Sequence, residues 1–194
     1  MIKGSRARHS ALPIDPQFLD RWSPRAMSGQ ALGEAELMTL LEAARWAPSS
    51  GNFQPWRFLY ALRGGDFWDV FMDIVVPANR LWAEQAGALV VLVSRSQRDD
   101  GRPARTHSYD TGAAWMSLAL QAWKSGLVAH GIEGFDYEKA ARVLRVPRDY
   151  TVEAMAVLGH PGDAQQLNER LRGREQPSDR RPLEQSACEG PFAF

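Results

Sequence analysis

The most informative stretch of the chain is Ala47-Pro48-Ser49-Ser50-Gly51-Asn52-Phe53-Gln54-Pro55-Trp56-Arg57. It places small hydroxyls, amides and prolines between a segment of helical pattern and a segment of strand pattern. Ser, Asn and Pro favour turns, so an ordinary helix-to-strand turn is the plainest interpretation. A turn alone does not explain a glutamine fixed between Phe53 and Pro55. The stretch therefore predicts a loop that hydrogen-bonds a polar heterocycle, which is a way of holding a cofactor.

The segments on either side of this loop have clear periodicities. Residues 34–44 carry apolar side chains at helical spacing, with acids in the first turn where the helix dipole favours them, and Pro48 ends the helix. Residues 57–61 have the composition of a short strand that ends at Gly64-Gly65. Residues 67–75 return to a helical pattern.

The middle of the chain predicts a central strand and a long helix. Residues 88–93 have no polar face, as a strand covered on both sides requires. Residues 110–125 are apolar almost all round, and Gly126 stands where a helix ends in the left-handed conformation. A helix of this kind has to be buried on most of its faces. A second subunit covering one side satisfies that need most simply, so we expect a homodimer.

The last third of the chain predicts a helix, a strand and an arm. Asp136 is placed to cap a helix that runs to Leu144 and ends before Pro147, and residues 151–158 are rich enough in β-formers for a second internal strand. Residues 173–182 are polar, interrupted by proline and rich in arginine. We expect them to form an extended arm.

Composition limits the possible classes of protein. The 194 residues are 44% hydrophobic, enough for one good core, and 23 basic residues balance 23 acidic ones. With no net charge, no global field attracts nucleic acid or an anionic membrane. The single cysteine, Cys188, excludes an internal disulfide and fits a reducing compartment. No apolar run follows the basic start of the chain and none is long enough to span a bilayer, so we expect a cytoplasmic protein without a membrane partner.

Other chemistries find no support in the sequence. It has neither a Gly-x-Gly-x-x-Gly after a strand, nor a Gly-Lys-Ser/Thr loop, nor a Gly-x-Ser-x-Gly elbow. The four histidines lack the spacing of metal ligands, so no metal site is expected. They are His9, His107, His130 and His160.

Five motifs occur in one order along the chain. They are Arg21-Trp22-Ser23-Pro24-Arg25, the Ala47–Trp56 stretch, residues 126–136 (Gly-Leu-Val-Ala-His-Gly-Ile-Glu-Gly-Phe-Asp), residues 158–162 (Leu-Gly-His-Pro-Gly) and Arg180-Arg181-Pro182-Leu183. In this order the chain resembles the FMN-dependent nitroreductase family from about Leu19 to Leu183. The resemblance implies an α+β, nitroreductase-like fold with a mixed, mostly antiparallel central sheet flanked by helices. It also implies an entwined homodimer with an extended C-terminal arm and two FMN sites at its interface.

The resemblance also implies a division of the chain. Residues 1–18 would be an N-terminal extension, residues 19–183 the FMN-binding domain, and residues 184–194 a tail that includes Cys188. The tail departs from the family pattern, and no role is assigned to it.

Arg21, Ser23 and Arg25 stand at alternate positions, so in extended backbone all three point the same way. This geometry suits a phosphate and the polar edge of a ring, although arginines near the start of a domain are more often plain surface charges. The resemblance implies that Arg21 and Ser23, with Trp22 between them, hold the phosphate end and the pyrimidine edge of FMN. Arg25 would be catalytic, near flavin N1 and O2, where a cation stabilises the negative charge of the reduced ring.

The resemblance assigns the loop to the dimer interface. Residues that match Pro48, Ser49, Ser50 and Asn52 reach the flavin bound mainly by the other subunit in the family, and we place Gln54 in the same set. Dimerisation would then be a condition of cofactor binding.

Further site residues follow from the resemblance. Asn79 would contact the flavin ring, although a solvent-facing Asn in a loop after Pro77 is equally compatible with the sequence. The main-chain amides of Ile132, Glu133 and Gly134 would face flavin N5, with Glu133 acting catalytically through its N–H. A plain loop between helices is the alternative. A lone histidine such as His130 is more often structural than catalytic.

The C-terminal arm would complete the phosphate site. The resemblance implies that Arg180 binds the FMN phosphate with Arg181 beside it, and guanidinium groups suit a phosphate dianion. Ser178 replaces a family lysine, which shifts the expected phosphate affinity onto Arg180 and Arg21.

The function implied is an FMN-dependent oxidoreductase. NADH or NADPH would give hydride to flavin N5, and a small electron-poor acceptor such as a nitroaromatic or a quinone would then receive it. Dehalogenation, enoate or semialdehyde reduction and dehydrogenation on the same scaffold stay open, as does a non-catalytic flavin-binding role. The arginine-rich residues 170–181 could instead contact nucleic acid, but the interleaved Glu175 and Asp179 argue against it. The sequence does not distinguish NADH from NADPH or name the acceptor.

Overall fold

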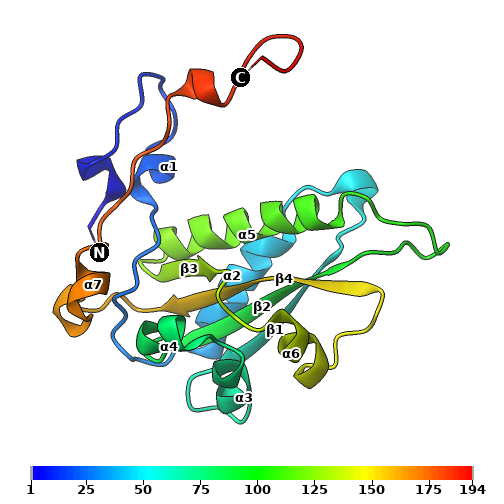
Figure 1. Ribbon diagram of the computed structural model, residues 1–194, viewed down its shortest axis with the longest axis horizontal. Helices are drawn as coiled ribbons and strands as arrows, with labels where there is room; N and C mark the ends of the chain where they lie inside the picture. Colours follow the sequence, from blue (N-terminus) through cyan, green and yellow to red (C-terminus); the bar gives the residue numbers. More distant parts are fainter. Residues whose placement is uncertain (1, 194) are drawn as a thin grey trace.

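A four-stranded sheet organises the computed structural model, which describes residues 2–193 (Figure 1). The strands are β1 (Trp56–Leu62), β2 (Ala88–Arg95), β3 (Val128–Ile132) and β4 (Tyr150–Gly159), in the order β1-β2-β4-β3. All three pairings are antiparallel. The expected α+β fold with a mostly antiparallel sheet is confirmed. Among the described residues the sheet has no parallel pairing, so within one chain it is not mixed.

Helices cover both faces of the sheet (Figure 1). On one face lie α2 (Glu34–Arg45) and α5 (His107–Lys124), and on the other lie α3 (Trp68–Asp73), α4 (Pro77–Ala83) and α6 (Tyr137–Val143). The side chains of β2 alternate between two cores, with Val90 and Leu92 facing α2 and α5, and Leu89 and Val91 facing the other helices. This is the doubly covered central strand that the run of apolar residues predicts.

Local signals fix several helix ends as expected. The carboxylate of Asp136 caps α6 by accepting a 2.9 Å hydrogen bond from Lys139 N. Gly126 follows α5 with φ of +73°, the left-handed conformation that glycine adopts without strain. In α5, Tyr109 and Met116 are exposed within the single chain. The helix is therefore incompletely covered by its own protomer, and the expected second subunit stays a prediction.

Two elements differ from the sequence-based expectation. Residues 128–132 form β3, which pairs with β4, where a loop between helices was the plain alternative. Asn79 lies within α4, so a loop after Pro77 is wrong. Pro77 occupies the first turn of that helix, where its missing N–H has no intrahelical partner to lose.

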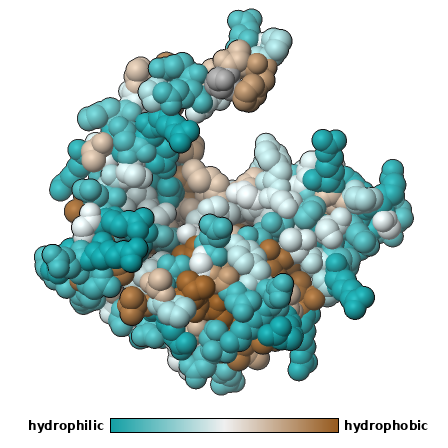
Figure 2. Space-filling view, viewed as in Figure 1, coloured by the Kyte–Doolittle hydropathy of each residue, from teal (hydrophilic) through white to brown (hydrophobic). Residues whose placement is uncertain are grey.

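Both ends of the chain leave the sheet as arms that run side by side (Figure 1). The N-terminal arm, residues 2–20, contains a 3-10 turn (Gly4–Arg6) and α1 (Pro16–Asp20). A second 3-10 turn (Ala164–Gln166) and α7 (Glu169–Arg172) precede the C-terminal arm, residues 173–193, whose only regular element is a 3-10 turn (Leu183–Gln185). The arm is extended, as predicted, and Figure 2 shows it standing away from the body with an open concave space beneath it. Within residues 2–193, no helix combines the length and the apolar character needed to cross a membrane.

Candidate functional site

Residues 21–26 present two different faces. Trp22, Pro24 and Ala26 are buried, whereas Arg21, Ser23 and Arg25 are half-buried. The backbone of Arg21 is extended, with φ of −67° and ψ of 124°, and its Nη1 donates to Ser23 Oγ at 3.2 Å. The alternate spacing of the three polar residues therefore produces a common polar face, as the sequence predicts.

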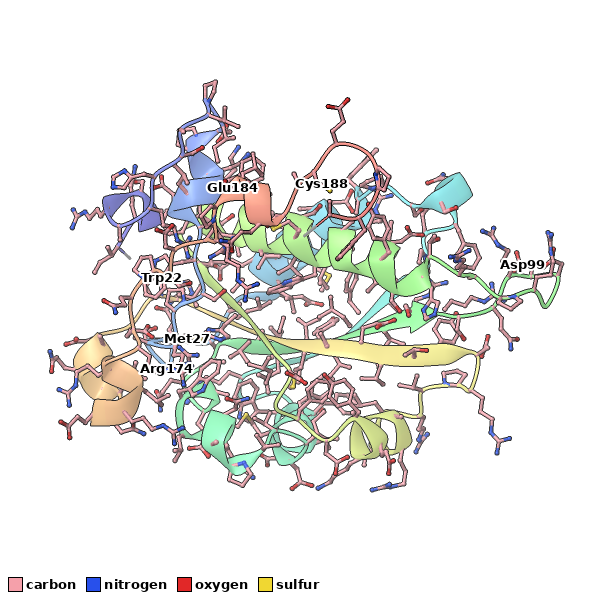
Figure 3. The ribbon with its side chains drawn as sticks, turned by 45° about the horizontal axis from the view of Figure 1, so that its top comes forward. Trp22, Met27, Asp99, Arg174, Glu184 and Cys188 are labelled. Carbon is pink, nitrogen blue, oxygen red and sulfur yellow. The ribbon has the colours of Figure 1, made fainter. Side chains whose placement is uncertain are left out.

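This polar face forms one wall of a hollow of about 310 Å³, here called the arginine hollow. The N-terminal arm, residues 21–25, β3 and the C-terminal arm all contribute to it. Figure 3 shows Trp22 and Arg174 at the end of the molecule where the arms meet the body, while Asp99 marks a loop at the opposite end. The residues that line the arginine hollow are Arg8, Arg21, Trp22, Ser23, Arg25, His130, Arg174, Gln176, Ser178 and Arg180.

Arg8, Arg21 and Arg25 are partly desolvated in this hollow, whereas Arg174 and Arg180 are exposed at its edge. Burial, followed by the charges of Arg8 and Arg180, lowers the pKa of Arg21. Burial also lowers the pKa of Arg25, against the opposing effect of the Glu175 carboxylate. The Nε of Arg21 is buried and has no hydrogen-bond partner among residues 2–193. A bound anion would relieve the repulsion and give this nitrogen an acceptor.

His130 forms part of the same wall as a neutral group. Burial lowers its pKa to about 4, so the ring is uncharged at pH 7. Its Nδ1 lies 3.0 Å from the carbonyl oxygen of Pro24, which only accepts, so Nδ1 is the donor. The ring lies 4.8 Å from that of Trp82, and the Arg25 guanidinium lies 5.9 Å from the same indole. The positive charge of the hollow therefore comes from its arginines.

Asn79 and Gly134 meet next to this hollow. Asn79 Nδ2 donates to Gly134 O at 3.2 Å, and a Cβ on Gly134 would stand 2.4 Å from that nitrogen. A larger residue at this position would displace the Asn79 amide. Asn79 also lines a second hollow of about 470 Å³, to which Arg25 and Arg174 contribute as well. Asn79 thus shares this hollow with Arg25, and Gly134 is bonded to Asn79. Of the neighbouring residues, Ile132 is buried in β3 and the side chain of Glu133 is exposed.

The Pro48–Gln54 loop does not line the arginine hollow of its own protomer. It is held by Asp110, whose buried carboxylate accepts from Ser50 N at 3.2 Å, and by Ser49 Oγ, which accepts from Gln54 N at 3.0 Å. Asn52 and Gln54 have φ of 55° and 51°, a left-handed conformation that side chains adopt at a cost. Such strain in a loop fixed from both sides is typical of a functional segment.

Arg180 and Arg181 are both exposed, but only Arg180 lines the arginine hollow. The resemblance implies that both arginines lie at the phosphate of FMN, but only Arg180 lies at the hollow. Within residues 2–193, no group of three or more His, Cys, Asp or Glu side chains could hold a metal ion.

Sequence reasoning missed Arg8, Arg174, Gln176 and Glu175. The carboxylate of Glu175 holds residues 21–26, here called the arginine-bearing segment. Its Oε1 accepts hydrogen bonds from Arg25 N at 2.7 Å and from Ala26 N at 2.8 Å. The sequence indicates only an acid within an arginine-rich run. These contacts join segments about 150 residues apart, for which no local pattern exists.

Replacing Glu175 by alanine should lower the free energy of unfolding by about 2 kcal/mol, since two half-buried N–H groups lose a charged acceptor. Urea denaturation measures the loss. Glu189→Ala, which removes an exposed carboxylate from the same arm, is the matched control and should change stability little. Equal effects of the two substitutions would contradict the positioning role of Glu175.

Comparison with known proteins shows which family and which solved structures this chain is similar to. A family model described as Nitroreductase family matches residues 19–67 and 65–160. A solved structure described as an oxidoreductase containing FMN is 43% identical, covers 96% of each chain and superimposes with a TM-score of 0.92. A putative nitroreductase from Desulfovibrio desulfuricans, solved in complex with FMN, is 23% identical with a TM-score of 0.72, over 95% of this chain and 100% of that one.

Two further relatives are similar in sequence. An uncharacterised 15.4 kDa protein of Mycolicibacterium smegmatis is 38% identical over 142 residues, which cover 69% of this chain and 95% of that protein. An NADH dehydrogenase of Thermus thermophilus is 28% identical over 182 residues, which cover 79% of this chain and 89% of that protein. Since the family model spans well over half of the sequence, the chain belongs to the nitroreductase family.

Proposed function

We propose that the chain is an FMN-dependent oxidoreductase that uses NADH or NADPH to reduce a small electron-poor acceptor such as a nitroaromatic or a quinone. The observation that carries the proposal is the arginine hollow, which gathers Arg21, Ser23, Arg25 and Arg180 at one end of the sheet. The 43% identical structure described as an FMN-containing oxidoreductase supports the cofactor, and the NADH dehydrogenase relative supports the nicotinamide.

The residues of the arginine hollow fit the phosphate of FMN. Arg21 carries a buried Nε without a partner among the described residues, and its hydroxyl neighbour Ser23 is a further donor. Arg180 faces the same hollow from the C-terminal arm. A dianion accepts charge-assisted hydrogen bonds from several guanidiniums at once, which suits such a cluster. Trp22 would form the apolar wall behind the phosphate.

The ring of FMN would extend from the arginine hollow toward Arg25, Asn79 and Gly134. FMN supplies the redox chemistry, since hydride exchange takes place at its N5. The Arg25 cation would favour negative charge at the pyrimidine edge, and it lies in a half-buried place where charge is weakly screened. We propose main-chain donors at Ile132, Glu133 and Gly134 near N5, where the glycine leaves room for close approach. The side chain of Glu133 takes no part.

We propose that two copies of the chain build each site. The loop residues Pro48, Ser49, Ser50, Asn52 and Gln54 do not line the hollow of their own protomer, so they would serve the flavin of the partner. The exposed Tyr109 and Met116 of α5 support a partner covering that helix. In this arrangement residues 19–183 form the FMN-binding domain, with 1–18 as an extension and 184–194 as a tail. Arg181 would then contribute less than Arg180.

Anaerobic addition of NADH or NADPH to the purified protein tests the function. We expect a yellow protein whose flavin absorbance is bleached, and whose colour returns when a nitroaromatic or a quinone is added. A yellow protein that stays oxidised with both nicotinamides would indicate a binding role without catalysis. A colourless protein that cannot be reconstituted with FMN would contradict both readings.

A further inference from the structure

The N-terminal arm delivers an arginine into the arginine hollow. Arg8 is only 6% exposed, although it lies in an arm that is otherwise largely exposed. Its Nε donates to Ser178 O at 2.6 Å, and its Nη1 donates to Arg21 O at 2.6 Å and to Leu19 O at 3.2 Å. One guanidinium thus connects the N-terminal arm, the arginine-bearing segment and the C-terminal arm.

Among residues 2–193, no carboxylate forms an ion pair with Arg8. Its hydrogen-bond acceptors are main-chain carbonyls, which orient the guanidinium but carry no negative charge. Burial and then the charge of Arg180 lower its pKa, and the carboxylate of exposed Asp179 acts in the opposite direction. Buried arginines are ordinarily paired with an acid, because the desolvated charge is costly when it stands alone. A bound anion would remove this cost.

The guanidinium of Arg8 is also oriented in advance. The three carbonyls engage Nε and Nη1, and residues 2–193 provide no hydrogen bond to Nη2. Arg8 shares the wall of the hollow with Arg21 and Arg180. A donor fixed in this way loses little conformational entropy when a ligand binds.

We propose that Arg8 is a phosphate-binding residue, so that the N-terminal arm closes over the phosphate of FMN and is joined there to the C-terminal arm at Ser178. The inference rests on the proposed FMN site and adds a ligand from outside residues 19–183. Arg8 would also supply the positive charge that Ser178 lacks. Riboflavin has the same ring without the phosphate, so its affinity should not depend on Arg8.

Titration of FMN and of riboflavin into the flavin-free, full-length protein tests this. Arg8→Gln should raise the dissociation constant of FMN at least about tenfold, the loss expected for one hydrogen bond to a charged group, and leave that of riboflavin within about twofold. Arg6→Gln is the matched control, because Arg6 is exposed and lines a different cavity. It should change neither constant. Arg8→Lys keeps the positive charge and should weaken the binding of FMN less than Arg8→Gln does.

The outcomes separate the inference from the proposed function. An equal loss of FMN and riboflavin affinity would show that Arg8 is merely structural, and unchanged FMN affinity would show that it does not bind; either result overturns the inference alone. If Arg8→Gln does not fold, the ratio of the two constants in Arg8→Lys decides, and a ratio equal to that of the wild type overturns it. Wild-type protein that binds neither flavin would overturn the proposed function, and the inference with it.

Discussion

Replacing Arg21 by alanine should raise the dissociation constant of FMN by about a hundredfold or more. Arg21 is half-buried, and the positive charges of Arg8 and Arg180 act on its guanidinium. Its Nε has no hydrogen-bond acceptor among the described residues. Each hydrogen bond to a charged group contributes about 1.5–3 kcal/mol, and about 1.4 kcal/mol corresponds to tenfold in affinity. Two such bonds to one phosphate give the predicted loss. Fluorescence titration of FMN into the flavin-free protein measures it.

Arg142→Ala is the control for this experiment, since it removes an exposed arginine from α6 at a distance from the hollow. It should leave the dissociation constant unchanged. A comparison of Arg180→Ala with Arg181→Ala then tests the separation of these neighbours, and we expect the larger loss for Arg180. An Arg21→Ala variant that binds FMN as the wild type does would refute the assignment of the phosphate site.

The second large effect concerns Arg25. Arg25→Ala should lower the midpoint potential of the bound flavin and slow its reduction by NADH or NADPH by about a hundredfold. The cause is the loss of a cation that stabilises negative charge in a site where such charge is weakly screened. Its contribution to the fold should survive, because Glu175 bonds to the backbone N–H of residue 25, which alanine retains. Potentiometric titration and anaerobic stopped-flow kinetics measure the two quantities.

Arg25→Lys preserves the charge and should restore most of the potential, although lysine cannot reproduce the planar fork of a guanidinium. Thermal unfolding should be similar in all three proteins. Unchanged potential and reduction rate in Arg25→Ala would remove the electrostatic role proposed for this residue, and a loss of folding would indicate a structural one.

The elements that sequence analysis predicted correctly are those with strong local signals. The acids and apolar spacing of α2, the uninterrupted apolar run of β2 and the Asp136 cap of α6 each act within a few residues. The strand β3 has no such signal, because His130 and Gly131 interrupt its apolar residues. It exists through its pairing with β4, and Gly131 makes room for the indole of Trp115, whose Cζ2 would stand 3.0 Å from an added Cβ.

The same distinction holds for the candidate site. Arg21, Ser23 and Arg25 could be predicted because three polar residues at alternate positions in extended backbone share a face. Arg8 could not, because its hydrogen bond to Ser178 spans 170 residues and belongs to the tertiary fold alone. In the basic start of the chain it is indistinguishable from Arg6, which lies on the surface.

A crystal structure of the FMN-bound protein would show whether two copies of the chain build each flavin site. We predict a phosphate within hydrogen-bond distance of Arg21 and Arg180 in the arginine hollow. The ring should lie against Arg25 and Asn79, and the Pro48–Gln54 loop of a second copy should contact its other side. FMN bound elsewhere on the chain, or held by a single chain with that loop in solvent, would contradict the proposed site.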